Sequence, residues 1–153
     1  MANTFIQVHL HFVFAPKYRA SLIHSDWEDD LYKYITGVVQ KNNHKMIIIN
    51  GMPDHVHMLI GLRATQSIAD LMQDVKAASS KWINDQNLCN GRFEWQTGYG
   101  AFSYSKSQLP NVIRYIEHQK DHHARKSFLE EYRLFLEKFE VAYDELYIFR
   151  EPE

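Results

Sequence analysis

Apolar and polar residues alternate along several short stretches of the chain, and a period of two is typical of β-strands. The first stretch lies within residues 4–19 and should end before Pro16, because proline is unsuited to the interior of a sheet. Its polar members Gln7, His9 and His11 would share the face opposite to the apolar side chains, as in a half-buried strand. Further strands are expected at residues 45–51 and 55–62, joined by a turn at 51–54, and around residues 93–105.

Other segments repeat their apolar residues at helical spacing and carry start signals. In the first, Glu28 follows Ser25 by three residues, which is the spacing of a capping box. Ser67 and Asp70 have the same spacing in the second, and Pro110 suits the first turn of the third. We therefore expect helices over residues 25–43, 67–85 and 109–123, and a further amphipathic helix within residues 127–149.

The order of these elements is β-α-β-β-α-β followed by helices. This order predicts an α+β fold of the ferredoxin-like (RRM-like) kind, an antiparallel sheet with helices on one face plus C-terminal helices. The chain has 153 residues, of which 45% are hydrophobic. That length suits one domain with its own core and is short for two, so we expect residues 1–153 to form a single domain.

Cysteine content and charge restrict the expected cellular location of the protein and the kinds of partner that it could bind. The single cysteine, Cys89, excludes an intramolecular disulfide, and no segment approaches the length of a membrane span, so a cytoplasmic location is expected. The net charge of −2 argues against a strongly basic nucleic-acid binder. However, residues 130–153 contain eight acidic and three basic side chains, which leaves +3 on residues 1–129. A phosphate-binding surface is therefore permitted on the first part of the chain.

Two histidines stand out in the strand expected at residues 55–62. His55 and His57 are separated by one residue, so both imidazoles should point to the face opposite to Val56 and Met58. The structural alternative is an edge strand whose polar outer face happens to contain histidine. The functional interpretation is a metal site, because imidazole binds several first-row divalent metals.

A second polar pair lies in the third helix. Tyr115 and Gln119 are four residues apart and share a helix face that is offset from the apolar stripe of that helix. A tyrosine at the edge of the core beside a solvated glutamine is the structural alternative. If the helix meets the histidine pair, then His55, His57 and Gln119 could together hold Mg²⁺ or Mn²⁺.

These residues lead to the hypothesis that the protein cleaves and rejoins a phosphodiester bond. An ion held by three neutral donors keeps its full charge and would act strongly on a phosphate oxygen. The Tyr115 phenol could then attack the phosphorus and form a phosphotyrosine bond, which conserves the energy needed to rejoin a strand. A metal-dependent hydrolase that uses water in place of Tyr115 is an alternative.

Four motifs follow one another along nearly the whole chain: HLHFVFAPKYR, NGMPDHVHMLIGL, WQTGYGAFSYS and VIRYIEHQKDHH. In this order they resemble the single-tyrosine HUH transposases, which include small insertion-sequence transposases and REP-associated tyrosine transposases. The resemblance implies an HUH transposase domain in which His55, His57 and Gln119 bind Mg²⁺ or Mn²⁺. It also implies that Tyr115 is the nucleophile of a metal-dependent endonuclease and strand transferase that forms a 5′-phosphotyrosine intermediate on single-stranded DNA.

The same resemblance also implies which molecules the protein binds. It predicts a homodimer, in which the tyrosine helix of one chain can complete the histidine pair of the other, and recognition of DNA hairpins beside the cleaved site. The acidic C-terminal segment that starts at Glu130 differs from the pattern of the family, because its negative charge would repel a DNA backbone. A domesticated hairpin-DNA-binding protein without transposition activity is the alternative function.

Secondary candidates for DNA contact are basic and aromatic. Side chains that could reach phosphates are Lys17, Arg19, Arg63, Lys76 and Lys81. Aromatic residues that could stack on unpaired bases are Trp95, Tyr99 and Phe102. Solvated surface charges and a buried aromatic core are the respective structural alternatives.

Overall fold

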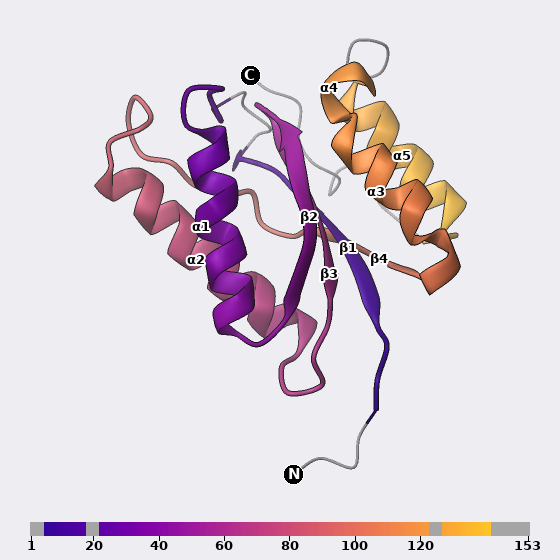
Figure 1. Ribbon diagram of the computed structural model, residues 1–153. Helices are drawn as coiled ribbons and strands as arrows, with labels where there is room; N and C mark the ends of the chain where they lie inside the picture. Colours follow the sequence, from indigo (N-terminus) through magenta and orange to yellow (C-terminus); the bar gives the residue numbers. More distant parts are fainter. Residues whose placement is uncertain (1–4, 18–21, 123–126, 142–153) are drawn as a thin grey trace.

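The computed structural model describes residues 5–17, 22–122 and 127–141. Its centre is one antiparallel sheet of four strands in the order β2-β3-β1-β4 (Figure 1). The strands are β1 (His9–Phe14), β2 (Lys45–Met52), β3 (His55–Gly61) and β4 (Gly100–Tyr104). The turn at Pro53 and Asp54 joins β2 to β3 as the predicted hairpin. The order places β3 and β1 in the middle of the sheet, with a neighbour on each side.

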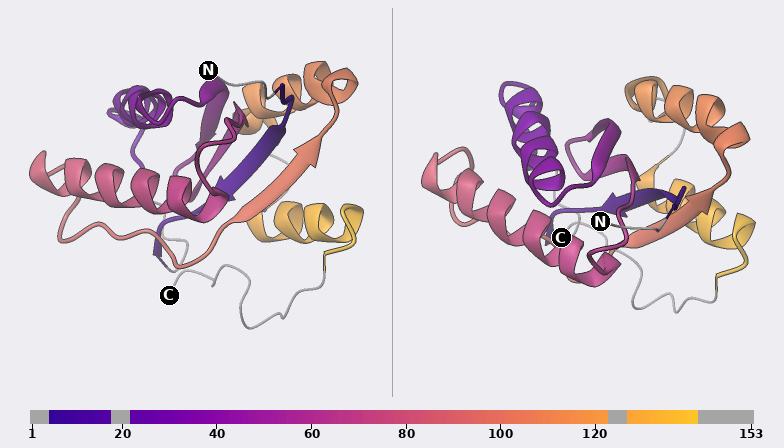
Figure 2. Two further views of the ribbon diagram at one scale, coloured as in Figure 1. Left: turned by 90° about the horizontal axis from the view of Figure 1, so that it is seen from below. Right: turned by 60° about the horizontal axis from the view of Figure 1, so that its bottom comes forward.

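Helices cover both faces of this sheet. On one face lie α1 (Glu28–Lys41) and α2 (Ile68–Asp85). On the other face, after the short helix η2 (Lys106–Gln108), lie α3 (Leu109–Glu117), α4 (Gln119–His122) and α5 (Phe128–Lys138). Figures 1 and 2 show the sheet between these two helical layers. The predicted α+β fold is confirmed, and the C-terminal helices form its third layer.

The alternation of side chains along the central strands assigns each residue to one layer. Apolar residues of one face pack with α1 and α2, and from β1 and β3 they are Leu10, Phe12, Phe14, Val56, Met58 and Ile60. On the other face, Val13 packs against α5 and Leu59 against α3. Both faces are therefore buried. The prediction of a half-buried first strand was wrong, and so was the edge-strand alternative for β3, because the C-terminal helices cover the face that was expected to meet solvent.

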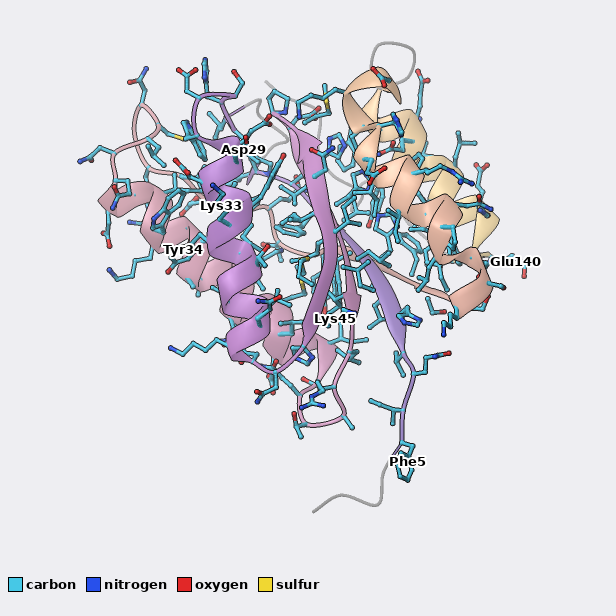
Figure 3. The ribbon with its side chains drawn as sticks, viewed as in Figure 1. Phe5, Asp29, Lys33, Tyr34, Lys45 and Glu140 are labelled. Carbon is cyan, nitrogen blue, oxygen red and sulfur yellow. The ribbon has the colours of Figure 1, made fainter. Side chains whose placement is uncertain are left out.

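The first strand is shorter than its alternating pattern suggests. β1 begins at His9, which pairs with Gly61 of β3 and Tyr104 of β4, and both partner strands end there. The preceding apolar side chains are exposed, with 94% of Phe5 and 45% of Ile6 accessible to solvent. Figure 3 shows Phe5 projecting from the extended segment beyond the sheet. Without a neighbouring strand, the alternating pattern does not continue the sheet.

The two predicted capping boxes have different outcomes. At α2 the Ser67 side chain accepts a hydrogen bond from the Asp70 N–H, as expected. At α1 the prediction was wrong, because the helix begins at Glu28 after Trp27, which has no side-chain capping bond. Trp27 is buried in the core, and burial of this large side chain outweighs a serine cap of about 1 kcal/mol.

Two other boundaries also differ from expectation. The helix predicted over residues 109–123 is interrupted at His118, so that α3 ends at Glu117 and α4 starts at Gln119. The fourth strand covers only residues 100–104, while Trp95 forms an isolated bridge with Pro16. The described part of the chain has no helix that is both long and apolar enough to cross a membrane.

Candidate active site

The two histidines of β3 lie on the sheet face that α3, α4 and α5 cover. Val56 points to the opposite face, into the core beneath α1 and α2, as strand alternation requires. Both His55 and His57 are fully buried. Because β3 is a central strand and the C-terminal helices lie over it, the imidazoles are held in the protein interior and not at a solvated edge.

Each imidazole is anchored through its Nδ1 atom. His55 Nδ1 lies 2.7 Å from a carboxylate oxygen of Asp54, and His57 Nδ1 lies 2.7 Å from His11 Nε2. Burial and the neighbouring His57 lower the pKa of His11 well below its usual value, so the His11 ring is neutral. These contacts leave both Nε2 atoms of the pair directed at the C-terminal helices. Histidines that bind metals are typically oriented in this way by a partner on the second nitrogen.

Gln119 meets the histidine pair from the first position of α4. Its side-chain oxygen lies 3.1 Å from His55 Nε2, and the residue is fully buried. The Gln119 amide nitrogen donates a hydrogen bond to the backbone oxygen of Tyr115, at 3.4 Å. The break at His118 does not separate the two predicted residues, because this bond still joins α4 to the preceding turn.

Tyr115 reaches the same centre from α3. Its ring lies edge-on to His57, with 5.8 Å between the ring centroids, and its hydroxyl donates a hydrogen bond to Glu131. Burial and the negative charge of Glu131 raise the pKa of the Tyr115 phenol above its usual value, so the phenol is protonated at neutral pH. The structure thus brings Tyr115, His55, His57 and Gln119 together within one chain.

Glu131 of α5 is the fifth polar residue at this centre, and only 5% of its surface is exposed. One carboxylate oxygen lies 3.0 Å from His57 Nε2 and 3.7 Å from His55 Nε2. The other carboxylate oxygen accepts the hydrogen bond from Tyr115. Glu131 therefore contacts the phenol and both imidazoles at once.

Glu131 was not among the predicted site residues, because it is one of the acids of the C-terminal segment that was expected to repel DNA. A signal was present in the spacing. Glu131 follows Phe128 by three residues and precedes Phe135 by four, so it belongs to the apolar face of the helix. A single acid within an apolar stripe indicates a buried carboxylate, and such a group requires a partner.

The donors at this centre suit a divalent metal. One ligand atom from each of His55, His57 and Glu131 lies within 4.8 Å of the other two. With the Gln119 oxygen added, the set comprises two imidazole nitrogens and two hard oxygens, a combination compatible with Mn²⁺ and other first-row ions. The residues present therefore fit a divalent ion.

Most of the secondary candidates lie away from this centre. Lys76 and Lys81 belong to α2, on the opposite face of the sheet. Lys76 donates hydrogen bonds to the backbone oxygens of Gln96 and Gly98, and Lys81 pairs with Asp85. The remaining basic candidates are Arg63, which follows the far end of β3, Lys17, which pairs with Glu94, and Arg19, which is outside the described residues.

Of the three aromatic candidates, Phe102 is buried, whereas Trp95 and Tyr99 are partly buried at the edge of the core. Phe102 is buried against α5 on the histidine face. Trp95 packs on Phe14, and its indole N–H donates to the Ser79 hydroxyl. Tyr99 packs against the core beneath α1 and α2. The buried-core interpretation is therefore confirmed for Phe102, while Trp95 and Tyr99 remain partly exposed.

Comparison of the sequence with known proteins identifies similar transposases. The family model described as "Transposase IS200 like" matches residues 4–119. The ISDra2 transposase TnpA of Deinococcus radiodurans is 26% identical over 121 residues, which cover 75% of this chain and 86% of that protein. The transposase for insertion sequence element IS200 of Salmonella typhimurium is 26% identical over 125 residues, covering 78% of this chain and 81% of that protein.

Two solved structures have the same fold. A transposase from Deinococcus radiodurans R1 gives a TM-score of 0.63 at 23% identity and covers 78% of this chain and 95% of its own. A REP-associated tyrosine transposase bound to a REP hairpin gives a TM-score of 0.61 at 13% identity and covers 80% of this chain and 73% of its own. The family model spans well over half of the sequence, and the chain therefore belongs to the IS200-like transposase family.

Proposed function

We propose that this transposase is a metal-dependent endonuclease and strand transferase that acts on single-stranded DNA through a 5′-phosphotyrosine intermediate. Residues 1–153 would act as one domain, with Tyr115 as the nucleophile and His55, His57 and Gln119 as metal ligands. One observation carries the proposal: the Tyr115 phenol and the Gln119 amide meet the histidine pair inside one buried centre. Membership of the family supports the assignment to DNA transposition.

The proposed roles follow from the chemistry of each group. A divalent ion, when bound, would polarise a phosphate oxygen and favour attack at phosphorus. The Tyr115 oxygen would form a bond to phosphorus while the bond from phosphorus to the 3′ oxygen of the departing strand breaks. The phenolic proton leaves Tyr115, and the released 3′ oxygen takes up a proton. Reversal by the same or another 3′-hydroxyl would reseal the strand and restore the phenol.

DNA with hairpin ends is the proposed substrate. Support comes from the structural neighbour that is bound to a REP hairpin, although at 13% identity that likeness concerns the fold alone. The alternative is a hairpin-binding protein without transposition activity. Binding of a hairpin alone does not require a buried phenol beside two imidazoles and an amide. We therefore favour the catalytic function.

The test is a covalent-adduct assay. The full chain is incubated with Mn²⁺ and labelled single-stranded oligonucleotides that carry a hairpin and its flanks, taken from the ends of repeats near its gene. A labelled protein band that survives denaturation, disappears with chelator and maps to Tyr115 by peptide mass spectrometry is expected. Binding of the hairpins with no adduct from any of these substrates would favour the alternative function.

The assembly of the centre can be tested separately. The resemblance predicts a homodimer with exchanged tyrosine helices, whereas Tyr115 and His57 of this structure meet within one chain. We expect a co-expressed mixture of the Tyr115→Phe and His57→Ala variants to form no more adduct than either variant alone. An adduct yield in the mixture above that of both variants would show exchange between subunits, and light scattering would report whether a dimer is present.

A further inference from the structure

We infer that Glu131 is an additional ligand of the divalent ion, so that α5 supplies part of the metal centre. The inference deepens the proposed function and rests on it, since it concerns the ion that His55, His57 and Gln119 are proposed to hold. It adds a carboxylate, delivered by the C-terminal helix of the same chain, to a donor set that would otherwise be neutral.

The spacing of the donor atoms supports this assignment. Ligand atoms about 2.1 Å from a small divalent ion lie about 3.0 Å apart when they are neighbours at right angles. Glu131 Oε1 lies 3.0 Å from His57 Nε2, and Gln119 Oε1 lies 3.1 Å from His55 Nε2. The separation of 3.7 Å between Glu131 Oε1 and His55 Nε2 is also within reach of a shared ion. The donors of β3 and α5 thus lie at ligand spacing from one another, and the Gln119 oxygen of α4 lies at ligand spacing from His55.

Electrostatics favours the same assignment. Glu131 is almost fully buried, and a buried carboxylate is costly unless a positive charge opposes it. A divalent ion at the two Nε2 atoms would place such a charge directly beside the Glu131 carboxylate, whose oxygen lies 3.0 Å from His57 Nε2. The carboxylate in turn reduces the charge of the ion and its ligands from +2 to +1.

The packing of α5 holds Glu131 in place. Phe128, one turn before it, stacks on the His55 ring with 4.1 Å between centroids and 9° between planes. Tyr132 and Leu136 pack in the cluster beneath β1 and β4. The second carboxylate oxygen holds the Tyr115 hydroxyl. Glu131 is therefore placed both to bind the ion and to position the phenol beside it.

The test measures Mn²⁺ binding directly, by the electron paramagnetic resonance signal of free Mn²⁺ during titration of the full chain. We expect Glu131→Gln to weaken binding at least tenfold, because an amide replaces the only charged ligand. Glu131→Asp keeps the charge on a shorter side chain and should bind with intermediate affinity. Glu130→Gln is the matched control, since it removes the same charge from an exposed position on the same helix, and its affinity should equal that of the wild type.

Thermal unfolding with and without Mn²⁺ separates ligation from folding. Unfolding in chelator gives the metal-free midpoint of the wild type and of the Glu131→Gln variant, so that any effect of the substitution on folding is measured by itself. Added Mn²⁺ should raise the midpoint of the variant by less than that of the wild type. Equal Mn²⁺ affinity in the two proteins would overturn the inference, even if the wild type forms the covalent adduct. Unchanged Mn²⁺ binding with a higher adduct yield would also overturn it, and would identify Glu131 as an obstacle to DNA.

Discussion

Replacing Tyr115 with phenylalanine should abolish the covalent adduct with single-stranded DNA. The substitution removes one oxygen and keeps the ring against His57, so the fold and the histidine pair should persist. Removal of a nucleophile typically costs a factor of about a thousand or more, so adduct formation should fall below detection. The measurement is the denaturing-gel assay with Mn²⁺, alongside circular dichroism to check the fold.

Tyr104→Phe is the control for this experiment. Tyr104 ends β4 and packs in the same cluster beneath α3 as Tyr115, but no contact joins its hydroxyl to the histidine pair among the described interactions. The Tyr104→Phe protein should form the adduct at a yield close to that of the wild type. Cleavage that persists without an adduct in Tyr115→Phe would support the hydrolase that uses water. An adduct that persists there would contradict the assignment of the nucleophile.

Replacing Gly51 with alanine should destabilise the hairpin that carries the histidines. Gly51 pairs with Val56, and a Cβ atom added to it would overlap the carbonyl oxygen of His55 and lie 3.0 Å from the Val56 Cα atom. These neighbours are backbone atoms of β3 and cannot move without shifting the strand. Overpacking of this kind costs roughly 1–3 kcal/mol. At about 2–4 °C per kcal/mol, the unfolding midpoint should fall by several degrees.

The same change should also weaken Mn²⁺ binding, because the nearest displaced atom is the carbonyl oxygen of His55. Gly37→Ala is the matched control: Gly37 is exposed within α1, and no described atom lies within 4 Å of its Cβ position. There, alanine should stabilise the helix by about 0.5–1 kcal/mol and leave Mn²⁺ binding unchanged. Equal unfolding midpoints for Gly51→Ala and the wild type would contradict the close approach of the two strands.

Local patterns identified the residues of β3 and the helices, because these depend on neighbours close in sequence. The period of two placed both imidazoles of the pair on one face of a strand, and they do share the covered face. The spacing of Tyr115 and Gln119 likewise predicted a shared direction, and both reach the histidines. The serine cap of α2 was also predictable, since it needs only one turn of chain.

Local patterns failed where distant segments compete for burial. The helix predicted to be capped by Ser25 begins after Trp27 instead. The Trp27 side chain packs in the core with residues that lie far along the chain. The first strand was expected to face solvent on one side, but α5 packs over Val13. A period of two cannot distinguish a solvated face from one that a later helix covers.

Glu131 is the clearest example of a role set by tertiary structure. As one of eight acids in residues 130–153, it contributes to a negative charge that would be expected to repel DNA. Packing of Phe128 on His55 instead turns this carboxylate inward, to a position 3.0 Å from His57 Nε2. Its neighbour Glu130 remains exposed. Net charge by segment therefore does not predict where an individual carboxylate lies.

The sequence by itself determined the strand and helix order, the shared face of His55 and His57, and the direction of Tyr115 and Gln119, because each depends on the geometry of a short stretch of backbone. Only the tertiary structure decided that these side chains meet within one chain, that the face is buried, and that Glu131 joins them. Residues 57 and 131 are 74 positions apart. Their contact depends on how α5 packs over the sheet, and burial of its whole apolar face determines that packing.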